Sequence, residues 1–144
     1  MPSVTTPYNP LRKYLWDGTL DLDNNTIKVA LVTSAYTFDA AHLNWAAVSA
    51  NEVANGAGYS TGGIALTSKA VSYSGAVGKF LADNPLWSAL TKTFRYAVVY
   101  AEGTLNGVVN PLLLCILLDN TPADIVVVGM DYSIQWSPNG ILSS

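Results

Sequence analysis

The residues best suited to do chemistry lie in a glycine-rich stretch. Gly58-Tyr59-Ser60-Thr61-Gly62 has the G-x-S-x-G spacing of a nucleophile elbow, in which a tight turn presents a serine to a histidine base. The chain has one histidine, His42, and it precedes this serine, whereas the hydrolases that use the turn have histidine last. No helix-forming stretch follows Gly62, although the elbow leads into a helix. The pattern predicts a glycine loop whose Tyr59 docks inward, in a protein that is not an enzyme.

A second group of residues has the spacing of a calcium loop. Asp21, Asp23 and Asn25 match its positions 1, 3 and 5. The glycine and the glutamate that such a loop needs further on are replaced by Thr26 and Val32. We expect a turn that leads into a strand, with a weak site for a hard cation as the alternative.

The remaining candidates also lack partners. The chain has a single histidine and a single cysteine, Cys115, whereas a structural zinc site needs about four nitrogen or sulfur ligands. Gly56-Ala57-Gly58 lacks the third glycine of a phosphate-binding loop. Asp119, Asp124 and Asp131 stand beside turn residues, where aspartate is common. We therefore predict no cofactor and no metal.

The composition indicates one domain with few charges. The chain has 144 residues, of which 50% are hydrophobic and 12% charged, about half the charge of an ordinary soluble domain. Part of its surface is therefore expected to be covered by a partner. The net charge of −3 disfavours direct binding of nucleic acid. No basic residue follows Arg95, so the acidic C-terminal third either faces a basic partner or has carboxylates that only solvate loops.

The N-terminal residues and the longest apolar run bear on localisation. Met1–Thr6 lacks the basic and apolar regions of a secretory signal. The longest apolar run, Leu112–Leu118, is far shorter than the ~20 residues that span a bilayer. We expect no membrane partner and assembly in the cytoplasm.

Short strands dominate the chain after an N-terminal arm and a helix. Residues 1–9 carry two prolines and predict an extended arm that can reach a neighbouring subunit, and residues 10–17 have the apolar spacing of a short helix. Ala40–Glu52 has the composition of another short helix. Stretches rich in β-branched and aromatic residues, separated by turn residues, are Thr26–Thr33, Ile64–Thr67, Ala70–Ser74, Gly78–Ala82, Thr93–Ala101, Leu112–Leu118, Ile125–Val128 and Tyr132–Trp136.

The separators decide the fold class. After Ile64, none is long enough to hold a crossover helix, so the strands are expected to be antiparallel. We predict that residues 10–144 form one mainly β domain, an antiparallel β-sandwich or jelly-roll-like fold, with a barrel-like arrangement as the alternative.

Leu112–Leu118 shows no alternation of apolar and polar residues. A strand that is apolar on both faces must be covered on both. The cover is expected from the two layers of its own fold, with a neighbouring subunit as the alternative. Cys115, inside this run, is predicted to be a small buried residue.

Four tryptophans and eight tyrosines are dispersed along the chain. Two or three of the tryptophans are expected in the core and one or two at an interface, with a carbohydrate platform as the alternative.

Several phrases of the sequence resemble a family of small virion proteins of tailed bacteriophages, which begin with a short helix and continue into a β domain. The phrases that carry the resemblance span most of residues 11–142. They are Tyr14–Gly18, Asp23–Val32, Glu52-Val53, Gly58–Thr67, Phe80–Trp87, Phe94–Tyr100, Ile134–Trp136 and Asn139–Leu142.

The resemblance implies a capsid decoration, or cement, protein on the virion. Such a protein binds the exterior of the head and joins neighbouring subunits of the major capsid protein, as a small cyclic homo-oligomer, a dimer or a trimer. The alternative is a tail or fibre-associated module that binds host carbohydrate. The candidate interface residues are Pro2, Val4, Tyr8, Leu11, Trp16, Leu114 and Trp136.

Overall fold

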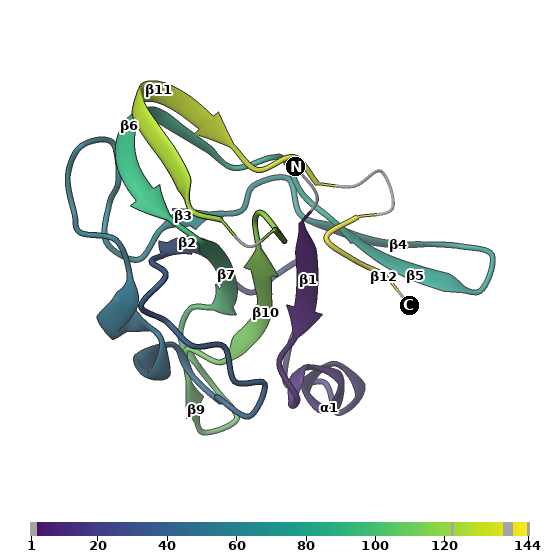
Figure 1. The fold of residues 1–144 in the computed structure, drawn as a ribbon. Helices are drawn as coiled ribbons and strands as arrows, with labels where there is room; N and C mark the ends of the chain where they lie inside the picture. The colour runs from purple at the N-terminus through teal and green to yellow at the C-terminus, as the bar shows by residue number, and fades with distance from the viewer. Residues whose placement is uncertain (1–2, 122, 137–139, 144) are drawn as a thin grey trace.

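The computed structural model describes residues 3–121, 123–136 and 140–143 and shows a mainly β chain with antiparallel sheets and one short α-helix (Figure 1). The strands are β1 (Val4–Pro7), β2 (Ile27–Val32), β3 (Ile64–Ala65), β4 (Ala70–Ser74), β5 (Val77–Leu81), β6 (Leu86–Phe94), β7 (Tyr96–Ala101), β8 (Thr104–Leu105), β9 (Val108–Val109), β10 (Leu112–Leu117), β11 (Ile125–Ser133) and β12 (Leu142–Ser143). The helix α1 spans Leu11–Trp16.

A five-stranded antiparallel sheet in the order β1-β10-β7-β2-β3 forms the centre of the molecule. Its inner strands β2, β7 and β10 are rich in Val, Ile and Leu, which fit a pleated sheet that is buried on both faces. The predictions at Thr26–Thr33 and Leu112–Leu118 are confirmed to within one residue at each end.

Both faces of the central sheet are covered by the chain itself. On one face, residues of β2, β7 and β10 share a core with α1, β5, β6 and β11. On the other face, Leu112 and Cys115 of β10 pack with Trp45 and Val48 from the segment between β2 and β3. The uninterrupted apolar run of β10 therefore needs no neighbouring subunit, and the burial predicted for Cys115 is confirmed.

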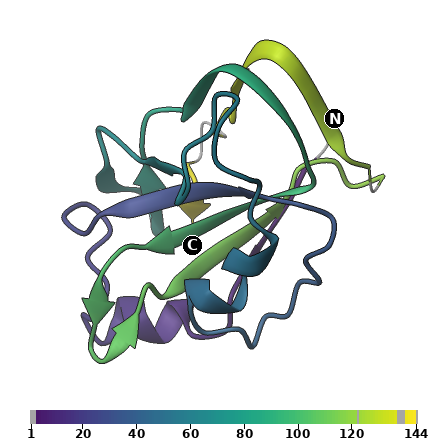
Figure 2. The same cartoon turned by 90° about the vertical axis from the view of Figure 1, so that its left-hand side faces the viewer.

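The segment over the second face is irregular. It carries two 3₁₀ turns, η1 (Trp45–Ala47) and η2 (Ser49–Asn51), in place of the single short helix expected at Ala40–Glu52. Trp45 stacks on Tyr100 of β7, with ring centroids 4.6 Å apart and an interplanar angle of 8°. Figure 2 shows the two turns in front of the central strands. Packing of one large ring, rather than a helical stripe, holds this segment in place.

The predicted strand Thr93–Ala101 is divided at Arg95. The Arg95 backbone N–H donates to Val32 O, and its carbonyl accepts from the Leu118 backbone N–H. At this residue the chain leaves β6, which pairs with β11, and enters β7, which belongs to the central sheet. The alternation of side chains does not record this change of partner.

The structure also alters the predicted strands around β11. The two short strands expected at Ile125–Val128 and Tyr132–Trp136 form one long strand that ends at Ser133. Most of its partner β6 was absent from the predicted strands. Together they form a curved two-stranded ribbon beside the central sheet (Figure 1).

β4 and β5 form a hairpin that projects from the rest of the molecule (Figure 1). Gly75 and Ala76 make its two-residue turn, and Gly75 has a φ of 61°. A glycine at the first turn position with positive φ suits the tight turns that follow the twist of a hairpin. The bounds predicted for β4 are confirmed.

The N-terminal arm predicted over residues 1–9 is corrected in its described part. Residues 4–7 are extended, but they form β1 and pair with β10. Pro7 fits this edge position. The neighbouring Tyr8 backbone N–H donates inward to Leu113 O, so the backbone of Pro7 faces outward. Proline has no N–H, and at an outward-facing position no hydrogen bond of the sheet is lost. This part of the segment is therefore a strand of the domain and not a free arm.

The helix predicted at residues 10–17 is confirmed as α1, with Leu11 and Tyr14 buried against the core.

Candidate interaction surfaces

The structure does not bring Ser60 and His42 together as a nucleophile and its base. His42 Nδ1 lies 2.9 Å from the hydroxyl of Tyr36, at the second face of the central sheet. Ser60 is exposed in the glycine loop, where its carbonyl accepts from the Gly63 backbone N–H. Among the described residues, no hydrogen bond joins Ser60 to His42. The pair needed for nucleophilic catalysis is not formed.

The glycine loop is held by a buried tyrosine. Tyr59 is 2% exposed, and its hydroxyl donates to Glu52 Oε2 at 2.5 Å. The same carboxylate oxygen accepts from the Gly62 backbone N–H at 2.7 Å, and Tyr100 donates to Gly62 O at 2.7 Å. Burial, with the carboxylate beside it, raises the pKa of Tyr59. The inward docking of Tyr59 is confirmed, whereas Glu52 had no signal in the sequence that pointed to this role.

Gly63 shows why this loop needs glycine. Its φ is +84°, and a Cβ atom built on it would lie 2.0 Å from the carbonyl oxygen of Val29. The loop backbone therefore lies directly against β2, and any side chain at this position would force the two apart.

The acidic turn before β2 satisfies its own polar groups. The Asp21 backbone N–H donates to Asn25 Oδ1 at 2.7 Å, and Asn24 Nδ2 donates to Asp21 Oδ2 at 2.8 Å. Hydrogen bonding lowers the pKa of Asp21, and the nearby Asp21 carboxylate raises that of Asp23. In residues 3–121, 123–136 and 140–143, no group of three or more His, Cys, Asp or Glu side chains is placed to hold a metal ion.

Buried hydroxyl groups lie beside β10. The Tyr8 and Tyr36 hydroxyls are 2.9 Å apart, and the latter also contacts His42. Burial raises the pKa of both tyrosines and raises the pKa of the Cys115 thiol to about 12. The phenols and the thiol are therefore protonated near neutral pH, and this cluster acts in packing.

Three of the predicted interface residues belong to the core. Tyr8, Leu11 and Leu114 are 1%, 1% and 2% exposed. Tyr8 ends the β1 segment over the second face of the sheet, whereas Leu11 and Leu114 pack in the core on the first face. A side chain covered by its own domain has no surface to offer a partner, so these three predictions were wrong.

The other predicted interface residues have different outcomes. Val4 is 44% exposed on the β1 edge and Trp16 is 84% exposed, so both remain predictions. Trp136 is half-buried against the core, and its Nε1 donates to Asp83 O at 3.1 Å. It therefore ties two loops of its own chain together. Pro2 lies outside the described residues.

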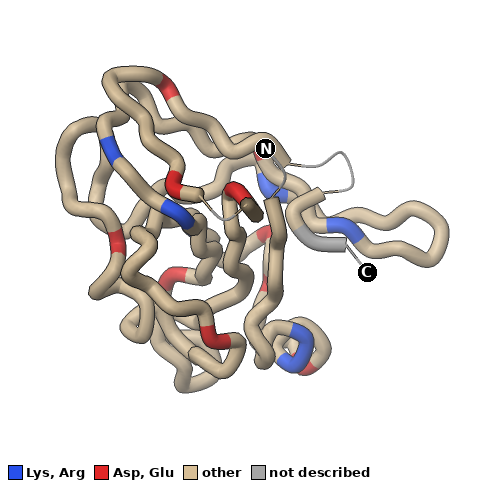
Figure 3. Tube along the Cα trace, in the orientation of Figure 1, with Lys and Arg blue, Asp and Glu red and all other residues tan. Residues whose placement is uncertain are grey.

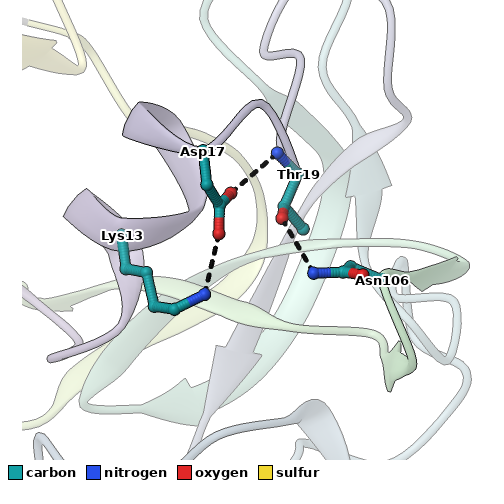
Figure 4. Close-up of polar contacts among 4 residues, drawn as sticks. All are labelled: Lys13, Asp17, Thr19 and Asn106. Atoms are coloured by element: carbon teal, nitrogen blue, oxygen red, sulfur yellow. Dashed lines mark hydrogen bonds and ion pairs between the residues drawn. The ribbon is translucent and has the colours of Figure 1, made fainter.

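The surroundings of Trp16 are polar. Lys13 Nζ pairs with Asp17 Oδ2 at 2.7 Å, and the Thr19 backbone N–H donates to Asp17 Oδ1 at 2.9 Å. Asn106 Nδ2 donates to Thr19 Oγ1 at 3.4 Å, which ties the end of α1 to the β8–β9 hairpin (Figure 4). The ammonium and the N–H groups lower the pKa of Asp17 to about 2. An open hollow beside Asp17 adjoins this network.

The carboxylates of the C-terminal third are bonded within the chain. The pairs are Glu102 with Lys28 at 2.5 Å, Asp119 with the Thr121 backbone N–H at 3.1 Å, Asp124 with Arg95 at 2.9 Å and Asp131 with the Ala89 backbone N–H at 3.0 Å. Charged residues are spread thinly over the whole trace (Figure 3). This arrangement supports the interpretation that these carboxylates serve the loops of their own domain.

The ribbon of β6 and β11 carries a group of exposed apolar side chains. Val126, Val128 and Met130 of β11 are 64%, 68% and 62% exposed, and Leu86 of β6 is 52% exposed. Ile125 and Val127, which alternate with the exposed valines, are buried in the core. We call Leu86, Val126, Val128 and Met130 the ribbon patch. The valines of β11 thus put apolar side chains on both faces of this strand, and the domain covers only the face of Val127.

Among the described residues, no helix is long and apolar enough to span a membrane. Comparison of the chain with protein-family models, with curated proteins and with solved structures finds no match.

Proposed function

We propose that this chain is a structural protein of a tailed-phage virion, a decoration protein that binds the exterior of the head and joins neighbouring major capsid subunits. The observation that carries the proposal is the ribbon patch. Its side chains are more than half exposed, although other residues of the ribbon, among them Ile125 and Val127, are built into the core. Exposed apolar side chains gain stability when a partner excludes water from them.

The rest of the molecule supports a binding role over catalysis. The residues with catalytic spacing are separated, and the buried titratable groups lie in packing clusters. The sequence resemblance to small virion proteins supplies the partner class. The site of action that follows is the capsid exterior, after assembly in the host cytoplasm.

Weak individual contacts suit such a role. A patch of four exposed side chains gives modest affinity, but a small cyclic homo-oligomer, a dimer or a trimer, binds a repeating shell at several points at once. The net charge of −3 disfavours direct contact with DNA.

We also keep a β-sandwich or jelly-roll description as a proposal. One layer would be the central sheet. The second would be formed by β5, β6 and β11, whose buried residues share its core. A rigid domain of this kind suits a cement protein, because it presents the ribbon patch at little cost in conformational entropy.

A carbohydrate-binding module of the tail or fibre is the second candidate. The observation that favours it is Trp16, which is 84% exposed and directly precedes Asp17, the carboxylate of the polar network with Thr19 and Asn106. Aromatic faces with adjacent polar groups are suited to sugars. The pinned glycine loop offers this candidate no support, because Tyr59 points into the core.

Adding the purified chain to heads that lack it tests the first candidate. We expect saturable binding to heads, and at least about tenfold weaker binding for Val128→Asp, because the variant puts a charge into a desolvated contact. Val109→Asp is the matched control, since Val109 is also an exposed strand valine, 55% exposed, but lies outside the ribbon patch. Equal binding of the two variants would remove the ribbon patch from the mechanism. Attachment to tails alone would favour the carbohydrate module.

A further inference from the structure

The outer edge of β4 presents backbone groups that no described strand uses. Phe80 O of β5 accepts from the Ile141 backbone N–H at 2.7 Å, so the polar backbone groups of Phe80 face away from β4. Val71 lies opposite Phe80 in the antiparallel pair, and its N–H and C=O therefore point away from β5. Tyr73, two residues further along, points the same way. Both residues offer a donor and an acceptor at the edge.

This edge carries none of the usual protection. β4 contains no proline and no charged residue, and all five of its residues are exposed. Val71 is 54% and Tyr73 is 82% exposed. The nearby Lys69 is turned to Asn25 O, to which its Nζ donates. Proteins generally block such edges by proline, charge or cover, because an open edge pairs with another strand.

We propose that β4 pairs with β4 of a second copy of this chain, antiparallel and across a two-fold axis at Ser72. In this register, Val71 of each copy faces Tyr73 of the other. Each such pair exchanges two N–H to C=O hydrogen bonds, so four form in all. Residues 70–74 are complementary to themselves in this arrangement, which is what an isologous interface requires.

The side chains favour the same register. Each Val71–Tyr73 contact is a cross-strand pair of a β-branched and an aromatic residue, a favourable combination. Val71 also lines a groove of about 460 Å³ at the base of the hairpin, into which the second copy's Tyr73 would fit. The residues that line the groove are Leu15, Gly18, Leu20, Asp21, Leu22, Asp23 and Val71. Pairing would thus cover the most exposed tyrosine ring and a partly apolar hollow together.

Charge does not oppose the pairing. The closest cation on the paired strands is Lys79, on β5 opposite Ser72. The two Lys79 residues would be three strand spacings apart, about 14 Å. This exceeds the screening length of about 8 Å at physiological salt. Charge therefore leaves the edge free to pair with a second copy.

The first test is the mass of the free chain in solution by light scattering over a range of concentrations. We expect a concentration-dependent rise from 15.3 kDa to twice that value. Ser72→Lys should remain monomeric, because it places like charges opposite each other at the axis. Thr5→Lys, the same change on the exposed face of the β1 edge strand, should dimerise as the unmodified chain does. Tyr73→Ala should weaken dimerisation about tenfold.

The second test reports the register. A cysteine at Ser72 would face its own copy across the axis at about 4.5 Å between Cα atoms, which suits a disulfide. Ser72→Cys should therefore cross-link under mild oxidation. Ser74→Cys is the control, because Ser74 would lie about 13 Å from its counterpart. Cys115 is buried and does not compete.

A chain that stays monomeric at high concentration overturns the inference, as does a trimer or equal cross-linking of the two cysteine variants. The inference rests on the self-association in the proposed function and not on head binding. Both tests use the free chain, so their failure is distinguishable from a failure to bind heads.

Discussion

β1 and β4 both lie at the edge of a sheet, but the chain treats the two edges differently. At β1, the backbone of Pro7 faces outward and has no N–H to offer, and the next residue, Tyr8, is 1% exposed. At β4, neither proline nor charge interrupts the edge, and Tyr73 is 82% exposed. The β1 edge is interrupted by proline and anchored in the core, whereas the β4 edge projects with its hydrogen-bonding groups intact.

The difference indicates which sheet edge can pair with a strand of another chain. Four residues at the N-terminus, extended and rich in threonine and proline, add to the buried strand β10 and complete the central sheet. The hairpin contributes Phe80 to the core at its base, but its distal half contributes little to the domain. Stability and association are thus assigned to different edges, and substitutions should separate them.

The largest expected change in stability is at Tyr8 of the β1 segment, and Tyr73 of β4 is its comparison. Tyr8→Ala should lower the free energy of unfolding by about 3–5 kcal/mol, because it leaves a cavity at a fully buried aromatic residue. Tyr73→Ala should change it by no more than about 0.5 kcal/mol, as is usual for an exposed side chain. Urea denaturation at a protein concentration low enough to keep the chain monomeric measures both. Comparable losses in the two variants would show that the hairpin is part of the cooperative core.

The sequence was sufficient to predict the strands whose apolar or β-branched side chains indicate that the strand is buried. Continuous apolar character marked β10, and β-branched residues after a turn marked β2, each to within one residue at either end. The division at Arg95 was not predictable, because the change of sheet is made by backbone hydrogen bonds that leave the side-chain pattern unbroken. The N-terminal segment was misread because proline and threonine occur in free arms and also in edge strands.

The candidate surfaces were harder to predict than the fold. Exposure depends on which elements pack together, and no local pattern distinguished exposed Trp16 from half-buried Trp136 or placed Tyr8 in the core. The sequence does not predict the ribbon patch, because Val126 and Val127 are both valine, although one is exposed and the other buried. The argument against a nucleophilic Ser60 used chain order and the lack of a following helix, and the structure bonds His42 to Tyr36.

Alkaline pH should act on the central sheet, where Tyr100 of β7 is buried. Burial raises the pKa of Tyr100 to about 12 from the ordinary value near 10. Between these values the unfolded chain releases the phenol proton while the folded chain retains it, so stability falls as the pH rises from 10 to 12. Each such group removes up to about 1.4 kcal/mol per pH unit in that window.

Thermal unfolding measured from pH 8 to pH 12 tests this dependence. Tyr100→Phe should lower the melting temperature at pH 8, because the hydrogen bond to Gly62 O is lost, yet show a shallower fall above pH 10. A parallel fall in the variant and the unmodified chain would mean that other groups govern the alkaline transition.

The smallest effect tests what closes the β1 edge. Pro7→Ala restores an outward N–H and should lower the free energy of unfolding by about 0.5–1 kcal/mol, because the unfolded chain becomes more flexible. In a chain whose β4 edge is blocked by Ser72→Lys, the same substitution should allow weak association through β1, detected as a mass that rises with concentration. One added hydrogen bond contributes only about 1 kcal/mol, so this association should be weaker than pairing through β4. If the double variant stays monomeric, the half-buried packing of β1 against β10, and not the proline, is what keeps this edge closed.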